Sequence, residues 1–157
     1  MTEPQVLLAP EGLLALSIKQ PWAALIVAGL KSIEIRTWPT AVRGPVLIHT
    51  GRTADVRPEG WQHITTPELQ GLAKLSGGLI GLATVVACRT YESAGMFAAD
   101  ALLHRNAPTW FVPPRLYGFE FAQPRPLPFR PQSGKLFFFP VDGVVVPPPE
   151  LTGPGPG

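Results

Sequence analysis

Three charged residues lie within six positions of one another, and their types suit the binding of an anion or a polar ligand. Lys31, Glu34 and Arg36 follow directly behind an apolar run, in the stretch KSIEIRTW. Two cations can hold a phosphate or polarise a carbonyl, and a carboxylate between two cations stays ionised. Glu34 would then orient the cations, accept a base N–H or act as a base. The same spacing also suits a surface ion-pair cluster, which contributes little to stability.

A strand is predicted to carry these charges. The stretch KSIEIRTW alternates with a period of two, so Ile33 and Ile35 share one face while Glu34 and Arg36 share the other. Lys31 enters from the preceding turn and can fold toward them. The charged side chains are therefore expected to converge on one side of the strand.

The remaining sequence predicts short strands joined by turns. Of the 157 residues, 16 are Gly and 20 are Pro, and most of them separate apolar runs. The second half of the strand at 116–130 contains prolines, which restrict it to a sheet edge or a loop. Helices are predicted over 20–28, 65–77 and 93–105, and strands over 13–19, 31–38, 43–51, 78–89, 116–130 and 134–146. We expect a mixed α/β domain, mainly β: a partly closed β-barrel of about six strands with two or three short helices.

Length and composition indicate one domain over 13–146, preceded by an N-terminal extension over 1–12 and followed by a disordered Pro/Gly tail over 147–157. An apolar run of membrane-spanning length and a basic leader are both missing, and Cys88 is the single cysteine. A cytoplasmic protein is the simplest interpretation. Neither a metal site nor a cofactor is expected, because the histidines lack ligand spacing and no phosphate-binding fingerprint occurs.

The charge distribution is more informative than the net charge of +2. Residues 17–57 hold six cations against two carboxylates, and residues 115–135 hold four cations against one. Each of the other segments carries net negative charge. The two basic segments could fold onto one face and attract phosphate, although scattered solubilising charge is the plainer explanation.

Further candidate ligand-binding residues flank the charged strand. Lys19 and Gln20 lie just before the predicted helix at 20–28, where they could reach a phosphate or a base edge. Trp22 belongs on the apolar face of that helix and is expected in the core. Ordinary capping, solvation or core packing would also account for such residues. The other candidates are Ser17, Trp38, Arg43, His49 and Tyr117.

The stretch LSIKQPWAALIVAGLKSIEIRTW, followed by RGPVLIHTG, closely resembles the ASCH family, the activating-signal-cointegrator homology domain of the PUA-like superfamily. The family signature G-x-K-x-x-E-x-R reads here as Gly29, Lys31, Glu34 and Arg36. Two later blocks, GLIGLATVVAC and LYGFEFAQPRPLPF with GKLFFF, resemble the central strand and the closing segment of the family. The likeness spans about 13–140, with four blocks in the expected order.

The resemblance implies a PUA-like β-barrel with a cleft lined by the signature residues. Members of the family are associated with RNA or other nucleic-acid binding, and some act on modified nucleosides by amide hydrolysis of acetylated cytidine or are reported as ribonucleases. In the amidohydrolase branch a Thr nucleophile stands where this chain has Glu34. This chain therefore lacks that nucleophile; Ser32 and Thr37 are nearby, but strand alternation turns Thr37 toward the Ile face.

Three functional hypotheses follow. The first is RNA or nucleotide binding in a cleft lined by Lys31, Glu34 and Arg36, without a membrane and in an undetermined oligomeric state. The second is an enzyme acting on a modified nucleoside or on RNA, with Lys31 as general acid/base and Glu34 as its partner. The third is protein interaction through the segment PRPLPFRP in an extended polyproline form.

Overall fold

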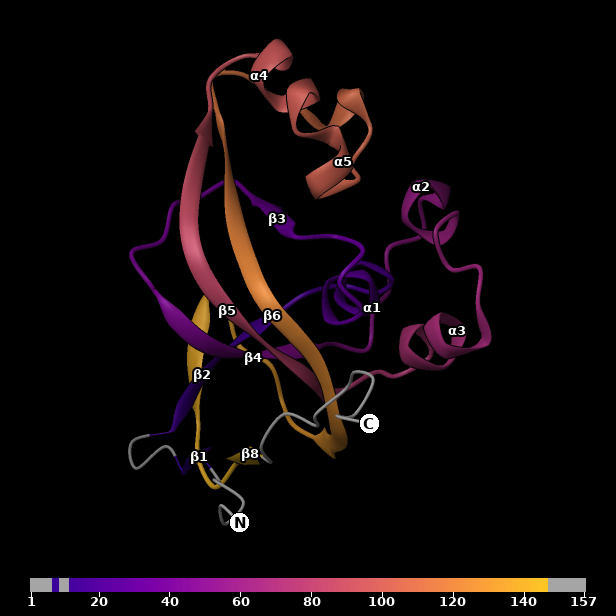
Figure 1. The fold of residues 1–157 in the computed structure, drawn as a ribbon, viewed down its shortest axis with the longest axis vertical. Helices are drawn as coiled ribbons and strands as arrows, with labels where there is room; N and C mark the ends of the chain where they lie inside the picture. The colour runs from indigo at the N-terminus through magenta and orange to yellow at the C-terminus, as the bar shows by residue number, and fades with distance from the viewer. Residues whose placement is uncertain (1–6, 9–11, 147–157) are drawn as a thin grey trace, which may run out of the picture.

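The computed structural model describes residues 7–8 and 12–146, and one six-stranded sheet dominates them (Figure 1). The strands lie in the order β3-β6-β5-β4-β2-β7, and a separate two-stranded sheet pairs β1 with β8. The predicted disordered tail lies outside the described residues, as does most of the predicted N-terminal extension. The strands are β1 (Leu7–Leu8), β2 (Leu13–Ser17), β3 (Ile33–Arg36), β4 (Gly44–Thr50), β5 (Gly78–Tyr91), β6 (Leu116–Pro131), β7 (Phe138–Val141) and β8 (Val145–Val146).

The six-stranded sheet is curved but not closed by hydrogen bonds. Its pairs are antiparallel except for β2 with β4, and β3 and β7 form its two edges. The edges approach each other through aromatic rings: Trp38, just beyond β3, lies 6.0 Å from Phe138 of β7 and 4.9 Å from Phe137, centroid to centroid. The expected mainly β architecture of about six strands is confirmed, and aromatic packing spans the open side.

The proline-rich half of β6 lies at a sheet edge, as predicted. Strand β3 pairs only with residues 117–120 of β6, whereas β5 pairs along the strand as far as Pro131. A proline has no N–H to donate, so prolines suit the part of β6 that extends beyond its pairing with β3. The segment PRPLPFRP therefore belongs to a long strand that runs beside β5 (Figure 1).

Helix α1 (Trp22–Val27) packs against the sheet and forms the centre of the core. All six of its residues are buried, and it contacts β4, β5 and β6. It is apolar all round, which is the pattern of a helix enclosed by other elements. The cluster around it combines residues of α1 with Leu16, Ile48, Ile80 and Phe119.

The other helices are short and lie at the periphery (Figure 1). Helix α3 (Pro67–Ala73) lies within the predicted range 65–77, and the Thr66 hydroxyl caps its N-terminus by accepting a hydrogen bond from Leu69 N at 3.2 Å. The helix predicted over 93–105 is divided at Asp100 into α4 (Ala94–Ala99) and α5 (Ala101–His104). The sequence did not predict α2 (Pro58–Trp61) or the 3-10 turn η1 (Pro108–Trp110). None of the helices in the described ranges has both the length and the hydropathy that crossing a membrane requires.

Candidate functional site

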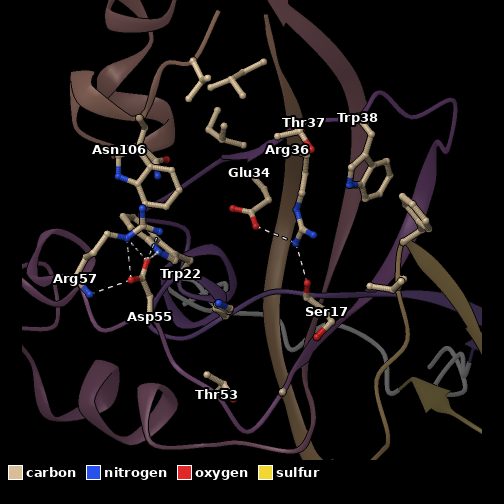
Figure 2. Close-up of a pocket in the computed structure, with 18 of the residues that line it drawn as sticks. Ser17, Trp22, Glu34, Arg36, Thr37, Trp38, Thr53, Asp55, Arg57 and Asn106 are labelled. Carbon is tan, nitrogen blue, oxygen red and sulfur yellow. Dashed lines mark hydrogen bonds and ion pairs between the residues drawn. The ribbon is translucent and has the colours of Figure 1, made fainter.

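A hollow of about 810 Å³ opens between the charged strand β3 and the loops that follow β4, α5 and β6. Its walls come from distant parts of the sequence, including residues 51–57, 106–112 and 135–137. Figure 2 shows Glu34 between two groups of side chains. One group contains Trp22, Asp55, Arg57 and Asn106, and the other contains Ser17, Arg36, Thr37 and Trp38.

Glu34 presents its carboxylate to the hollow between two cations. Its Oε2 accepts a hydrogen bond from Arg36 Nη2 at 3.1 Å, and its Oε1 lies 3.7 Å from Lys31 Nζ. Arg36 Nη2 also donates to the Ser17 carbonyl at 2.8 Å. Both hydrogen bonds that Arg36 makes among the described residues use Nη2, so its Nε and Nη1 remain available to a ligand. The predicted convergence of the charges is present.

Lys31 lies beneath the hollow rather than in its wall. Its side chain is fully buried, and Nζ donates to the His104 carbonyl and to Asn106 Oδ1, the latter at 2.7 Å. Burial lowers the pKa of Lys31 from 10.5 to about 8; Glu34 opposes this effect and Arg36 adds to it. Lys31 therefore contacts both Glu34 and Asn106 from below and connects them.

Asn106 supplies a donor to the hollow that the sequence analysis did not single out. Because Lys31 Nζ can only donate, the amide oxygen of Asn106 must face it. The Nδ2 group then points the other way and has no partner among the described residues. Asn106 lines the hollow, so Lys31 holds an acceptor, Glu34, and a donor, Asn106, in fixed positions.

The opposite wall is built around Asp55. Its carboxylate accepts a hydrogen bond from Trp22 Nε1 at 2.9 Å and further ones from Arg57, from the backbone N at 2.9 Å, from Nε at 3.0 Å and from Nη2 at 2.9 Å. Burial alone would raise the pKa of Asp55, but the hydrogen bonds from Arg57 and Trp22 outweigh it and lower the pKa to about 2. Asp55 therefore keeps Arg57 in place on this wall, with the guanidinium 3.6 Å from the ring centroid of Trp110.

Trp110 is fixed from behind by Glu59. The Glu59 carboxylate accepts hydrogen bonds from Trp110 Nε1 at 2.7 Å and from Ala107 N at 3.0 Å. The Trp110 ring meets Trp22 edge to face at 5.7 Å. These contacts attach η1 to α2. Trp22 and Trp110 thus form an aromatic wall, and the Arg57 guanidinium lies on the Trp110 ring.

This wall could not be predicted from the sequence because its members are far apart in the chain. The stretch GRTADVRPEG directly after a buried strand was a usable signal, since polar loops at strand ends often carry binding residues. The partner Trp110 gave no comparable signal, because 55 positions separate it from Asp55. Only the packing of η1 against α1 and α2 brings them together.

The hollow carries an excess of positive charge. Glu34 and Asp55 are its only lining carboxylates among the described residues, and each is paired with an arginine. Both basic segments of the sequence contribute cations to the hollow, although 115–135 supplies only Lys135. The lining cations are Lys19, Arg36, Arg52, Arg57 and Lys135.

Half of the predicted site residues line the hollow and half do not. Lys31 lies directly below it, as described above. The lining residues are Ser17, Lys19, Glu34, Arg36 and Trp38. The others are Gln20, Arg43, His49 and Tyr117, which are not among its lining residues.

Two of the residues outside the hollow are engaged by the backbone. Gln20 is buried, and its amide group donates to the Leu72 carbonyl at 2.8 Å and accepts from Ala24 N at 3.0 Å, which ties α1 to the end of α3. Arg43 is exposed and donates to the carbonyls of Thr40 and Val42. Both side chains therefore bind to backbone groups of the fold and do not line the hollow.

The remaining two lie close to the hollow. Tyr117 lines a second, smaller hollow next to Thr37. His49 is buried directly behind Ser17, with Nδ1 2.9 Å from the Ser17 hydroxyl. No group of three or more His, Cys, Asp or Glu side chains in the described part of the chain is placed to hold a metal ion.

The open six-stranded sheet, the enclosed helix α1 and the hollow at β3 define a PUA-like fold. Solved structures of the ASCH protein from Zymomonas mobilis share it: one matches with a TM-score of 0.54 at 15% identity, covering 77% of this chain and 74% of that chain. A mutant of the same protein matches with a TM-score of 0.55, also at 15% identity, covering 77% of this chain and 75% of that chain. The family model of the ASCH domain matches residues 16–123, and the chain belongs to the ASCH domain family. No curated protein matches this chain.

Proposed function

We propose that the hollow binds single-stranded RNA, with one unpaired base inside it and the flanking phosphates at its rim. The ASCH family is commonly thought to bind RNA. The observation that carries the proposal is the combination of aromatic walls, unpaired cationic donors and one accessible carboxylate in a hollow of about 810 Å³. A cavity of this size accommodates a nucleotide. We also propose a cytoplasmic location, in keeping with the single cysteine.

The aromatic residues suit the stacking of an unpaired base. On one side of the hollow the planar Arg57 guanidinium lies on the Trp110 ring, and on the other side Trp38 lies with Phe137 next to it. Stacking of a base on an aromatic side chain contributes about 1–3 kcal/mol without demanding a particular sequence. Phe137 is more than half exposed at the mouth, so it is free to meet a second base.

The polar groups between the walls suit the edge of that base. Glu34 accepts N–H groups and Asn106 Nδ2 donates to carbonyl or ring-nitrogen acceptors. Lys31 holds both of them from below, so their positions do not depend on the ligand. A preformed donor and acceptor bind with a smaller loss of conformational entropy than mobile side chains do.

The exposed cations of the rim suit the phosphates. Lys19, Arg52 and Lys135 line the hollow and are exposed, whereas Arg36 lies deeper. Each cation that neutralises a phosphate releases condensed counterions, so affinity should fall as salt rises.

Fluorescence anisotropy with a labelled single-stranded RNA nonamer tests the proposal. We expect the logarithm of the dissociation constant to rise linearly with the logarithm of the salt concentration, with a slope of about 0.7 for each phosphate engaged. Arg52→Ala and Lys135→Ala should each lower the slope by about that amount. Lys74→Ala is the matched control, because Lys74 is exposed at the C-terminal end of α3 and does not line the hollow. Affinity that does not change with salt, or equal effects of all three substitutions, would reject the proposal.

The enzyme hypothesis based on Lys31 receives less support from the geometry. A general acid or base must come within hydrogen-bonding distance of the substrate. Lys31 Nζ is fully buried and already faces the His104 carbonyl, Asn106 and Glu34. The lowered pKa suits proton transfer, but the position favours a role in holding its neighbours. Catalysis by Lys31 and Glu34 stays a prediction.

A further inference from the structure

Ser17 and His49 form a hydroxyl–imidazole pair at the edge of the hollow. They are Cα partners in the register of the parallel strands β2 and β4, so their side chains leave the sheet side by side. The distance from Ser17 Oγ to His49 Nδ1 is 2.9 Å. This is hydrogen-bonding distance, and it is the distance at which an imidazole can take a proton from a serine.

The other ring nitrogen determines which tautomer His49 adopts. His49 Nε2 lies 2.7 Å from the Gln132 carbonyl. A carbonyl oxygen accepts but cannot donate, so in this contact Nε2 must carry the proton. Nδ1 of the neutral ring is then unprotonated and accepts the hydrogen bond from the Ser17 hydroxyl. The pair is therefore in the state that a nucleophile and its base require, with the carbonyl as the orienting third group.

The surrounding chain holds the His49 ring in one position. The ring is buried and meets Phe139 edge to face at 5.6 Å. Gly134 packs so closely that a Cβ there would lie 2.6 Å from Cε1 of the ring. The loop at 132–134 therefore touches the imidazole on one side and orients it on the other, which leaves the ring little freedom to rotate.

Ser17 is half-buried and lines the hollow, whereas His49 lies behind it. A small ligand in the hollow can therefore meet the serine without displacing the histidine. The Arg36 guanidinium is held on the backbone of the same residue, with Nη2 2.8 Å from the Ser17 carbonyl and with Nε and Nη1 unused among the described residues. Preformed cationic donors next to a nucleophile stabilise the oxyanion of a tetrahedral intermediate.

We propose that Ser17 is a nucleophile and His49 its general base in the hydrolysis of a carboxylic ester held in the hollow. Ser17 Oγ forms a bond to the ester carbonyl carbon while its proton passes to His49 Nδ1, and Arg36 holds the oxyanion. The bond from carbon to the alcohol oxygen then breaks, and His49 returns the proton to the leaving alcohol. Water attacks the acyl-serine by the same route, releases the carboxylic acid and restores Ser17. Ser17 and His49, which carry this activity, have no part in the proposed RNA binding, and the activity needs no nucleic acid.

The test uses the full chain without RNA, with a fluorophosphonate probe and p-nitrophenyl acetate. We expect the probe to add to the protein once and peptide mass spectrometry to place it on Ser17. Ser17→Ala should abolish labelling and ester turnover. Gly134→Ala should slow labelling by about 100-fold, the scale of a lost general base, because the added methyl displaces the His49 ring. Ser133→Ala, an exposed neighbour, is the matched control and should label like the wild type.

Folding is checked separately by circular dichroism and thermal denaturation. If His49→Gln fails to fold, Ser17→Ala and Gly134→Ala still decide the question, since neither removes the imidazole. Labelling at another residue, or equal labelling of the wild type and Ser17→Ala, would overturn the proposal. Loss of RNA binding has no bearing on these outcomes, so failure of the two proposals can be told apart.

Discussion

At the scale of single residues, Lys31 is the group whose role changes most between sequence and structure. Its charge next to Glu34 and Arg36 predicts a ligand contact, yet the side chain is fully buried under the hollow. A buried ammonium is tolerated because three oxygen-bearing partners surround it: the His104 carbonyl, Asn106 and Glu34. The signature lysine of this chain thus holds Asn106 and Glu34 in place from beneath the hollow.

Burial of Lys31 predicts that stability rises with pH above about 8. The pKa of Lys31 is about 8 in the folded protein and near 10.5 when the chain is unfolded. Below pH 8 both states are protonated and Lys31 adds no pH dependence. Between these values the unfolded state binds more protons, so the free energy of unfolding increases with pH, by up to about 3 kcal/mol.

Urea denaturation at pH 7.5, 8.5 and 9.5 measures this effect. The Lys31→Met variant should unfold at a lower urea concentration at every pH, and its free energy of unfolding should not increase between pH 8.5 and 9.5. The range stops at pH 9.5 because burial also raises the pKa of Tyr91, whose ionisation opposes folding at higher pH. Identical pH slopes for the wild type and Lys31→Met would show that Lys31 is not buried in its charged form.

At the scale of elements, the contact between α1 and β5 decides where the charged strand lies. Val27 of α1 packs directly onto Gly81 of β5, where a Cβ would lie 2.5 Å from Val27 Cγ2 and 2.7 Å from the Arg125 carbonyl. The close approach of Val27 and of the Arg125 carbonyl requires glycine at this position. The backbone conformation does not require it, because the φ of Gly81 is not positive. The turn after α1 leads straight to Lys31 and β3, so this contact positions the signature residues.

Gly81→Ala should therefore destabilise the protein, whereas Gly71→Ala should not. The methyl at position 81 has no space, and overpacking of this kind costs about 1–3 kcal/mol. Gly71 lies in the exposed part of α3, with nothing within 4 Å of a built Cβ, so alanine there should stabilise the helix by about 0.5–1 kcal/mol. Chemical denaturation of both variants measures the difference. Equal midpoints would contradict the close packing of α1 on β5.

At the scale of the whole molecule, aromatic packing replaces hydrogen bonds where the sheet stays open. Trp38 follows β3 at one edge and contacts Phe138 of β7 at the other, with Phe119 of β6 at 5.0 Å and Phe137 on the outside. The side of the hollow that contains Ser17 and Arg36 lies next to this contact (Figure 2). The shape of the site thus depends on an interaction between the two ends of the sheet.

Trp38→Ala should lower stability by about 3–5 kcal/mol, as loss of a large packed aromatic does. Trp38→Phe should restore part of this loss, because a smaller ring still reaches Phe119 and Phe138. Trp61→Ala is a control, since Trp61 is exposed on α2. Its Nε1 donates a hydrogen bond to the Asp55 carbonyl at 2.7 Å. Thermal denaturation compares the three variants. A Trp38→Ala variant as stable as Trp61→Ala would mean that the edges do not support each other.

Local patterns predicted much of the fold. The N-terminal cap of α3, the strand character of Ile33–Arg36 and the edge position of the prolines in β6 all follow from the geometry of a few neighbouring residues. Helix α2 was not predicted because four residues carry no periodic signal. The break at Asp100 was not predicted because the apolar pattern continues across that residue. The end of α5 is marked by Arg105, whose φ is 64°.

The sequence by itself determined which side chains share a face. Glu34 and Arg36 had to point the same way because a strand repeats every two residues. Only the tertiary structure decided which faces meet: Lys31 under the hollow, Arg57 on Trp110, and Ser17 against His49. The last pair is 32 positions apart and depends on the register of the parallel strands β2 and β4, whose connection passes through α1 and β3. A register between strands that are distant in the chain is set by the assembled core, and no local stretch of sequence specifies it.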